Sequence, residues 1–418
     1  FVNAQNSGAI YYVSTSGNDS NSGSQSQPWR TIQKAADVVN PGDTVLIRGG
    51  AEVYSERVIF SRSGTATNKI TFRNFTGETP IIDGTGLGGD QDTPLVNLSS
   101  VSYVALSGIE IRKSKGMNLS IIGTSHHLEI SGMNIHSSAS SSGIFIEESS
   151  AVPTFTKIFG NNKIHDNHLG GITLWLSSGG YYLIEGNEVY NNFGFGNFDG
   201  IQIGGNSGGT HHIVVRNNVI HDNATGIIGA GADNLDLGGH SSNSHYLVEG
   251  NDVYGSAGSF KIHSNNETDY TPSYHISRFN RLTGIGHTTY GAPNPVAWYN
   301  NTFFNVGTGN FFSFVGNNGN LGETTTATST DSRRMNWKNN IFYQKDATDA
   351  YLLQVNGLFD ASYYSIRLQN NLYRFAPTGR IGWPLPPPQC CINGSQFSVY
   401  QNTNPPHLQD IGSVTTTL

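Results

Sequence analysis

The chain has 418 residues, 51 of them glycine, and only 13% of its residues are charged. Glycine without a three-residue period excludes collagen, and no stretch of about 18 apolar residues is present that could span a membrane. The net charge of −7 argues against a nucleic-acid surface, which needs a basic face. The composition therefore predicts an all-β protein of strands and turns, with neither nucleic acid nor membrane as a partner.

The N-terminal region carries two signals. Residues 1–6 read as the remnant left after removal of a leader, which together with the low charge predicts a secreted, extracellular protein. In residues 31–39 apolar side chains fall at helical spacing, and a turn signal at 40–43 precedes a strand that begins at Thr44. We expect a short helical cap at about residues 28–50 that covers the end of a stacked structure, because an exposed coil edge would aggregate.

One phrase recurs along the chain at intervals of roughly 20–40 residues, the range of solenoid repeats. It consists of an asparagine, any residue, an aliphatic or aromatic residue, and usually a histidine or aromatic residue. Its clear copies begin at Asn162, Asn187, Asn218, Asn251, Asn280, Asn301, Asn340 and Asn371, and weaker copies contain Ile109 and Met133. Short segments of period-2 alternation flank the copies, which is typical of strands with one buried face.

These units predict a right-handed parallel β-helix of about ten coils, in which the asparagines stack as a hydrogen-bonded ladder. A β-propeller fits less well because its blades are longer and carry their own signatures. We expect one β-helix domain over residues 1–375. The proline-rich segment 376–418 is expected to be a C-terminal cap or tail, since proline cannot donate ladder hydrogen bonds. We expect a monomer.

The second strands of the central coils can be aligned by their apolar residues. Ile172, Ile201, Leu235 and Phe260 form one inward column, and Leu174, Ile203, Leu237 and Ile262 form another. The residue between the two columns must point outward. That outward column reads Thr173, Gln202, Asp236 and Lys261.

Three aspartates are predicted to converge near this column. Asp199 and Asp233 precede neighbouring strands by the same distance, and coils lie about 4.8 Å apart. Asp199, Asp233 and Asp236 would then concentrate negative charge unless a cation holds them, and carboxylate oxygens suit Ca²⁺. A solvated polar face with an Asp–Lys surface pair is the alternative.

Three short segments resemble the family 9 polysaccharide lyases, the β-helical pectate lyases. They are Asp199-Gly200-Ile201, the run from Ala232 to Asp236, and Ser259-Phe260-Lys261, and looser similarity covers residues 10–375. The resemblance implies that Asp199, Asp233 and Asp236 bind Ca²⁺ and that Lys261 is the catalytic base. The family pattern has a further aspartate where this chain has Ala232, so one carboxylate is missing.

The implied reaction is β-elimination of a uronic-acid polymer, with pectate or polygalacturonate as the first expectation and alginate or a glycosaminoglycan as alternatives. A cation at the substrate carboxylate stabilises the charge that develops when the C5 proton leaves. A neutral lysine can take that proton, because a nearby cation lowers the pKa of a lysine. A glycoside hydrolase that uses Asp233 and Asp236 as a pair, or a non-catalytic glycan-binding β-helix, remains an alternative.

The remaining candidates are weaker. Gln202, His263, Arg216 and Arg281 are predicted to contact the acidic polysaccharide. Cys390 and Cys391 are adjacent, so a strained mutual disulfide is not expected, and two such residues cannot make a zinc motif.

Overall fold

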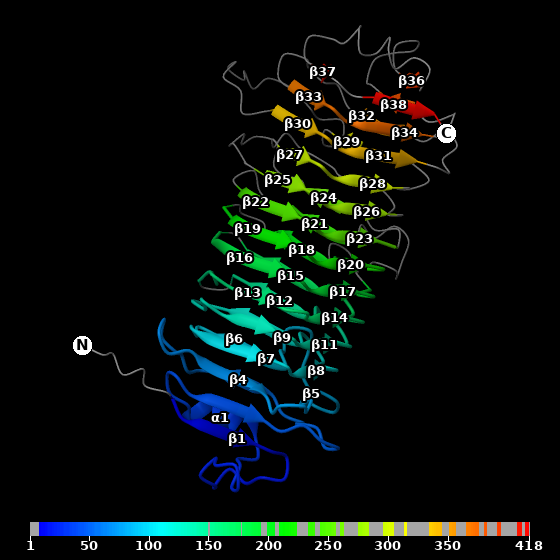
Figure 1. Ribbon diagram of the computed structural model, residues 1–418. Helices are drawn as coiled ribbons and strands as arrows, with labels where there is room; N and C mark the ends of the chain where they lie inside the picture. Colours follow the sequence, from blue (N-terminus) through cyan, green and yellow to red (C-terminus); the bar gives the residue numbers. More distant parts are fainter. Residues whose placement is uncertain are drawn as a thin grey trace, which may run out of the picture.

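A computed structural model of the chain describes residues 8–417 with internal gaps (Figure 1). The ranges without a described structure are 1–7, 149–150, 177, 194–198, 205–208, 224–232, 239–242, 256–259, 263–274, 284–295, 305–312, 316–333, 345–350, 357–364, 376–379, 383–390, 394–407, 412–413 and 418.

The described strands form three parallel sheets, two of which run along most of the molecule. Sheet 1 has fourteen strands: β1 (Ile10–Val13), β2 (Thr44–Ile47), β4 (Ile70–Asn74), β7 (Val104–Ser107), β10 (Glu129–Ser131), β13 (Lys157–Phe159), β16 (Gly180–Glu185), β19 (His211–Arg216), β22 (Ser244–Glu249), β25 (His275–Arg278), β27 (Val296–Tyr299), β30 (Arg334–Lys338), β33 (Ser365–Gln369) and β37 (Leu408–Ile411). Sheet 2 has twelve strands: β5 (Ile81–Asp83), β8 (Glu110–Arg112), β11 (Asn134–His136), β14 (Lys163–His165), β17 (Glu188–Tyr190), β20 (Val219–His221), β23 (Asp252–Tyr254), β26 (Arg281–Thr283), β28 (Thr302–Phe304), β31 (Ile341–Gln344), β34 (Leu372–Phe375) and β38 (Val414–Thr417).

Sheet 3 is shorter and has eight strands: β3 (Val58–Phe60), β6 (Val96–Ser99), β9 (Leu119–Ile122), β12 (Ile144–Glu147), β15 (Ile172–Trp175), β18 (Ile201–Gly204), β21 (Leu235–Leu237) and β24 (Phe260–Ile262). A fourth sheet holds β29 (Ser313–Val315), β32 (Tyr351–Asn356), β35 (Arg380–Gly382) and β36 (Cys391–Asn393), of which the last pair is antiparallel. Each central coil adds one strand to sheets 3, 1 and 2 in turn, which makes the molecule the right-handed parallel β-helix predicted from the repeat.

The predicted inward columns are confirmed by the strand register. Ile172 lies opposite Ile201, Ile201 opposite Leu235, and Leu235 opposite Phe260. All four side chains are buried in one continuous hydrophobic core. Period-2 alternation therefore sends every second residue of these strands into the core.

The predicted asparagine ladder is also confirmed. The Nδ2 of Asn218 donates to the Oδ1 of Asn251 at 3.0 Å and to the carbonyl oxygen of Ile184 at 2.9 Å, while its Oδ1 accepts from the Nδ2 of Asn187 at 3.0 Å. The ladder asparagines are buried from Asn162 to Asn371. Each side chain thus satisfies a backbone carbonyl at the turn and ties one coil to the next.

The N-terminal cap agrees with the expectation, whereas the number of coils and the C-terminal end differ from it. The helix α1 (Ile32–Val38) forms where it was predicted, with Thr31 as N-cap, and lies at the N-terminal end of the stack (Figure 1). Fourteen strands in sheet 1 exceed the expected ten coils, because the first coils lack the asparagine phrase that defined the repeat. Within segment 376–418, β37 and β38 pair with β33 and β34, so the stacking continues past residue 375.

In the described residues, no helix is long and apolar enough to cross a membrane.

A buried histidine in sheet 1 makes stability depend on pH. His275 is 3% exposed, its Nδ1 accepts a hydrogen bond from the Tyr246 amide at 3.2 Å, and burial lowers its pKa from 6.5 to about 3. Between these values the unfolded chain binds a proton that the folded chain does not, so stability falls as pH drops below 6.5. We expect this residue to remove about 1–2 kcal/mol of unfolding free energy between pH 6.5 and pH 5.

The substitution His275→Asn tests this prediction, since asparagine keeps an acceptor near the position of Nδ1 but does not titrate. Urea unfolding at both pH values should show a smaller loss for the variant than for the wild type. Equal losses would mean that His275 is not the titrating group.

Candidate metal centre

The strand register of sheet 3 aligns the four residues of the predicted outward column. Thr173 is opposite Gln202, Gln202 opposite Asp236, and Asp236 opposite Lys261. Thr173, Gln202 and Asp236 each lie between two core residues of their own strand. Thr173 and Gln202 are nonetheless buried, and Asp236 is half-buried.

Three carboxylates meet beside this column, as predicted. One oxygen from each of Asp199, Asp233 and Asp236 lies within 4.8 Å of the other two. Asp199 is 1% exposed and Asp233 is 2% exposed, and the Asp233 amide donates to Asp199 Oδ1 at 2.5 Å. Burying several negative charges this close together is costly unless a cation neutralises them.

The backbone around the cluster is held by a second asparagine ladder that the sequence reasoning missed. Asn167, Asn192 and Asn223 continue in register to Asn234, the residue after Asp233; the Asn223 Nδ2 donates to Asn234 Oδ1 at 3.1 Å. The sequence contains a signal for this second ladder, because asparagines recur five residues after Asn162, Asn187 and Asn218. This ladder fixes the turn that presents Asp233.

Gly200 lets the two ligand-bearing turns approach each other. Its amide donates to the Asp233 carbonyl at 2.9 Å, and a Cβ on this residue would lie 2.5 Å from the carbonyl oxygen of Asn234 and 2.6 Å from the Asn223 side chain. A larger residue would push the turn of Asp199 away from that of Asp233.

Gln202, which is paired with Asp236 in the strand register, carries a further oxygen. The residue is 6% exposed, and its Oε1 has no hydrogen-bond donor among the described residues. A buried amide oxygen normally has a partner. Three carboxylates and an amide oxygen are the hard ligands that Ca²⁺ prefers, so this donor set fits the cation implied by the resemblance.

Lys261 is brought to the site by its backbone. It lies in β24 directly opposite Asp236, and its side chain is outside the described part of the structure. His263, Ala232 and Cys390 lie outside the described residues, as does the side chain of Cys391.

The structure does not bring Arg216 and Arg281 to the cluster. Arg216 is in β19 of sheet 1, where its Nε donates to Glu185 at 2.7 Å, and this hydrogen bond raises the pKa of the guanidinium. Arg281 is in β26 of sheet 2, where its Nε donates to Asp252 at 2.7 Å. Both belong to sheets other than the one that carries the aspartates, so a role in substrate binding would have to be played elsewhere on the molecule.

The fold and site together define a right-handed parallel β-helix with an aspartate cluster on one sheet. Residues 11–323 match the sequence profile described as "Pel9A-like, right handed beta helix region". The chain belongs to this family.

Two curated proteins and one solved structure are similar to parts of the chain. An uncharacterized protein, YwoF of Bacillus subtilis, is 32% identical over 142 residues, and pectate lyase PEL9 of Emericella nidulans is 37% identical over 92 residues. These alignments cover 32% and 21% of this chain and only 30% and 22% of the relatives. The crystal structure of a lacto-N-biosidase from Eubacterium ramulus has a TM-score of 0.52 at 14% identity, over 89% of this chain and 64% of that one, which shows a shared fold.

Proposed function

We propose that the protein is a secreted polysaccharide lyase that cleaves a uronic-acid polymer, with pectate as the first candidate, by Ca²⁺-assisted β-elimination. The observation that carries the proposal is the cluster of Asp199, Asp233 and Asp236 within 4.8 Å, with the Lys261 backbone directly opposite Asp236. The family and its pectate lyase relative support the choice of reaction class.

In this proposal the metal ligands and the catalytic base are different residues. The three aspartates, with Gln202, would hold Ca²⁺, which when bound supplies positive charge to the substrate carboxylate. Neutral Lys261 takes the C5 proton, and the electrons of that C–H bond form the C4–C5 double bond. The C4–O bond breaks with its electrons leaving on the glycosidic oxygen, which takes a proton from water to become the hydroxyl of the new chain end. The products are a new chain end and an unsaturated uronic acid.

The convergence of three carboxylates favours this reaction over hydrolysis by an aspartate pair. A glycosidase needs two carboxyl groups that flank the scissile bond, with the sugar or a water between them. One oxygen from each of Asp199, Asp233 and Asp236 lies within 4.8 Å of the other two, an arrangement suited to sharing one cation.

Incubation with polygalacturonate, alginate and a glycosaminoglycan tests the proposal. We expect ultraviolet absorbance from the unsaturated product with one of these polymers, polygalacturonate first, and loss of that signal when EDTA removes Ca²⁺. New reducing ends without absorbance would indicate a hydrolase. Retention of the polymer without either product would indicate a non-catalytic binding protein.

A further inference from the structure

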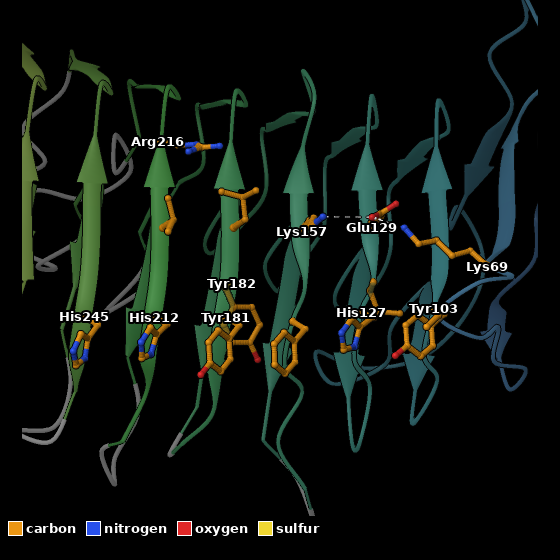
Figure 2. Close-up of a pocket in the computed structure, with 15 residues that line it drawn as sticks. Lys69, Tyr103, His127, Glu129, Lys157, Tyr181, Tyr182, His212, Arg216 and His245 are labelled. Atoms are coloured by element: carbon orange, nitrogen blue, oxygen red, sulfur yellow. Dashed lines mark hydrogen bonds and ion pairs between the residues drawn. The ribbon is translucent and has the colours of Figure 1, made fainter.

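A groove of about 660 Å³ runs over the outer face of sheet 1, away from the sheet that carries the aspartates. Figure 2 shows its two sides: a row of rings along the starts of the strands, and charged side chains nearer their ends. The reaction proposed above makes no use of this groove.

One wall of the groove is an unbroken row of stacked rings, one from each of six successive coils. Neighbouring ring centroids are 4.5–4.9 Å apart. All six residues have positive φ, which is uncommon for bulky side chains and places each ring at the same point of its turn. We call these residues the aromatic row: Tyr103, His127, Phe155, Tyr181, His212 and His245.

The stacking determines which part of each ring meets the groove. Because neighbouring rings cover each other's faces, the row presents ring edges together with phenol and imidazole polar atoms. Ring edges carry the positive end of the aromatic quadrupole and favour oxygen atoms. Phe155 and Tyr181 are 40% and 46% exposed, so these edges are accessible among the described residues.

Three cations also line the groove, among apolar side chains such as Leu128, Leu183 and Val214. Glu129 sits between Lys69, at 2.6 Å, and Lys157, at 3.7 Å, which leaves one positive charge in excess. The side chains of Lys69 and Lys157 are 41% and 54% exposed against 23% for Glu129, so the ammonium groups are the more accessible. Arg216 adds a third cation, paired with Glu185. The three cations and their two carboxylate partners together carry an excess of one positive charge, on a chain of net charge −7.

The shape and chemistry of the groove narrow the class of ligand. The strands beneath it are hydrogen-bonded on both sides, so no free edge is available for a peptide strand to join the sheet. Three cations on an acidic chain are too few for a nucleic-acid backbone. The row spans about 24 Å and offers one ring per coil, every 4.8 Å or so, a repeat that suits an extended linear polymer of oxygen-rich units.

We propose that this groove is a second, non-catalytic binding site for an acidic polysaccharide chain, whose hydroxyl and carboxylate oxygens meet the aromatic row and the lysines. The choice of a uronic-acid polymer as the ligand rests on the proposed function; the location and charge of the groove do not. A second contact with the same polymer would raise the local concentration of substrate at the aspartate cluster.

Gel retardation of the full chain by polygalacturonate, with EDTA present to prevent turnover, tests the site. The double variant Lys157→Ala/Tyr181→Ala should bind about tenfold more weakly, the effect of losing one ring contact and one charge contact together. The matched control is Lys163→Ala/Phe193→Ala, which removes a lysine of 58% exposure and a ring of 46% exposure outside the groove and should bind like the wild type.

A second variant distinguishes weaker binding from misfolding of the double variant. Lys157→Glu keeps every ring, and it should also weaken binding and reduce its sensitivity to salt. Methyl-esterified polygalacturonate, which lacks the charge, should bind the wild type more weakly than the free acid. Unchanged binding of both groove variants, or equal binding of the two polymers, would overturn the proposal.

The two proposals fail separately. Groove variants should still release unsaturated product from short oligouronates, which do not need a second contact. If the wild type binds polygalacturonate through the groove but forms no unsaturated product from any polyuronate, the proposed lyase function is refuted and the proposed binding site is supported. If product forms but the groove variants bind normally, only the groove fails.

Discussion

Replacement of Lys261 by methionine is expected to lower turnover of the uronic-acid polymer at least about 100-fold, the usual effect of removing a positioned base. Methionine has a similar volume but cannot accept the C5 proton. Because the backbone of Lys261 is paired with that of Asp236 and the substitution leaves this pairing unchanged, the fold and the proposed Ca²⁺ site should stay intact. The rate of absorbance increase from unsaturated product measures the loss.

Two controls define this result. Lys163→Met changes an exposed lysine on sheet 2 and should leave turnover unchanged. Calorimetric titration with Ca²⁺ should give the same affinity for Lys261→Met as for the wild type. Near-wild-type turnover in Lys261→Met would show that another group takes the proton.

Removal of one buried carboxylate is expected to have the second large effect. Asp233→Ala should weaken Ca²⁺ binding at least about tenfold, because the proposed site would keep only two of its three carboxylates. The lyase activity should fall with it. Calorimetric titration of both proteins measures the change in affinity.

The stability of the same variant separates a metal ligand from a structural residue. In EDTA, Asp233→Ala should unfold at a temperature no lower than the wild type, since it has less repulsion to bury. Added Ca²⁺ should raise the Tm of the wild type but have much less effect on the variant, because a ligand stabilises only the state that binds it. Asp37→Ala, in an exposed position of α1, is the control. Identical Ca²⁺ titrations for wild type and Asp233→Ala would contradict the assignment.

Much of this site follows from periodicity in the sequence. Alternation of apolar and polar residues determines which side chains of a strand face the core, and matching the apolar residues of successive coils aligns their strands. These two rules were enough to place Gln202, Asp236 and Lys261 in one column and to bring Asp199 and Asp233 beside it. The recurring asparagines indicate the fold class, and helical spacing of apolar residues predicts α1.

The turns were decided only by the tertiary structure. Turn lengths differ from coil to coil, so counting aligns only part of each turn. Asn167, Asn192 and Asn223 keep a regular five-residue spacing from the first ladder, but Asn234, which continues their ladder, comes eleven residues after Asn223. The aromatic row depends in the same way on a shared left-handed backbone conformation at one point of each coil. Arg216 and Arg281 could not be placed from the sequence for a related reason. Alternation predicts that a side chain points outward, but only the winding of the coil determines which of the three sheets carries it.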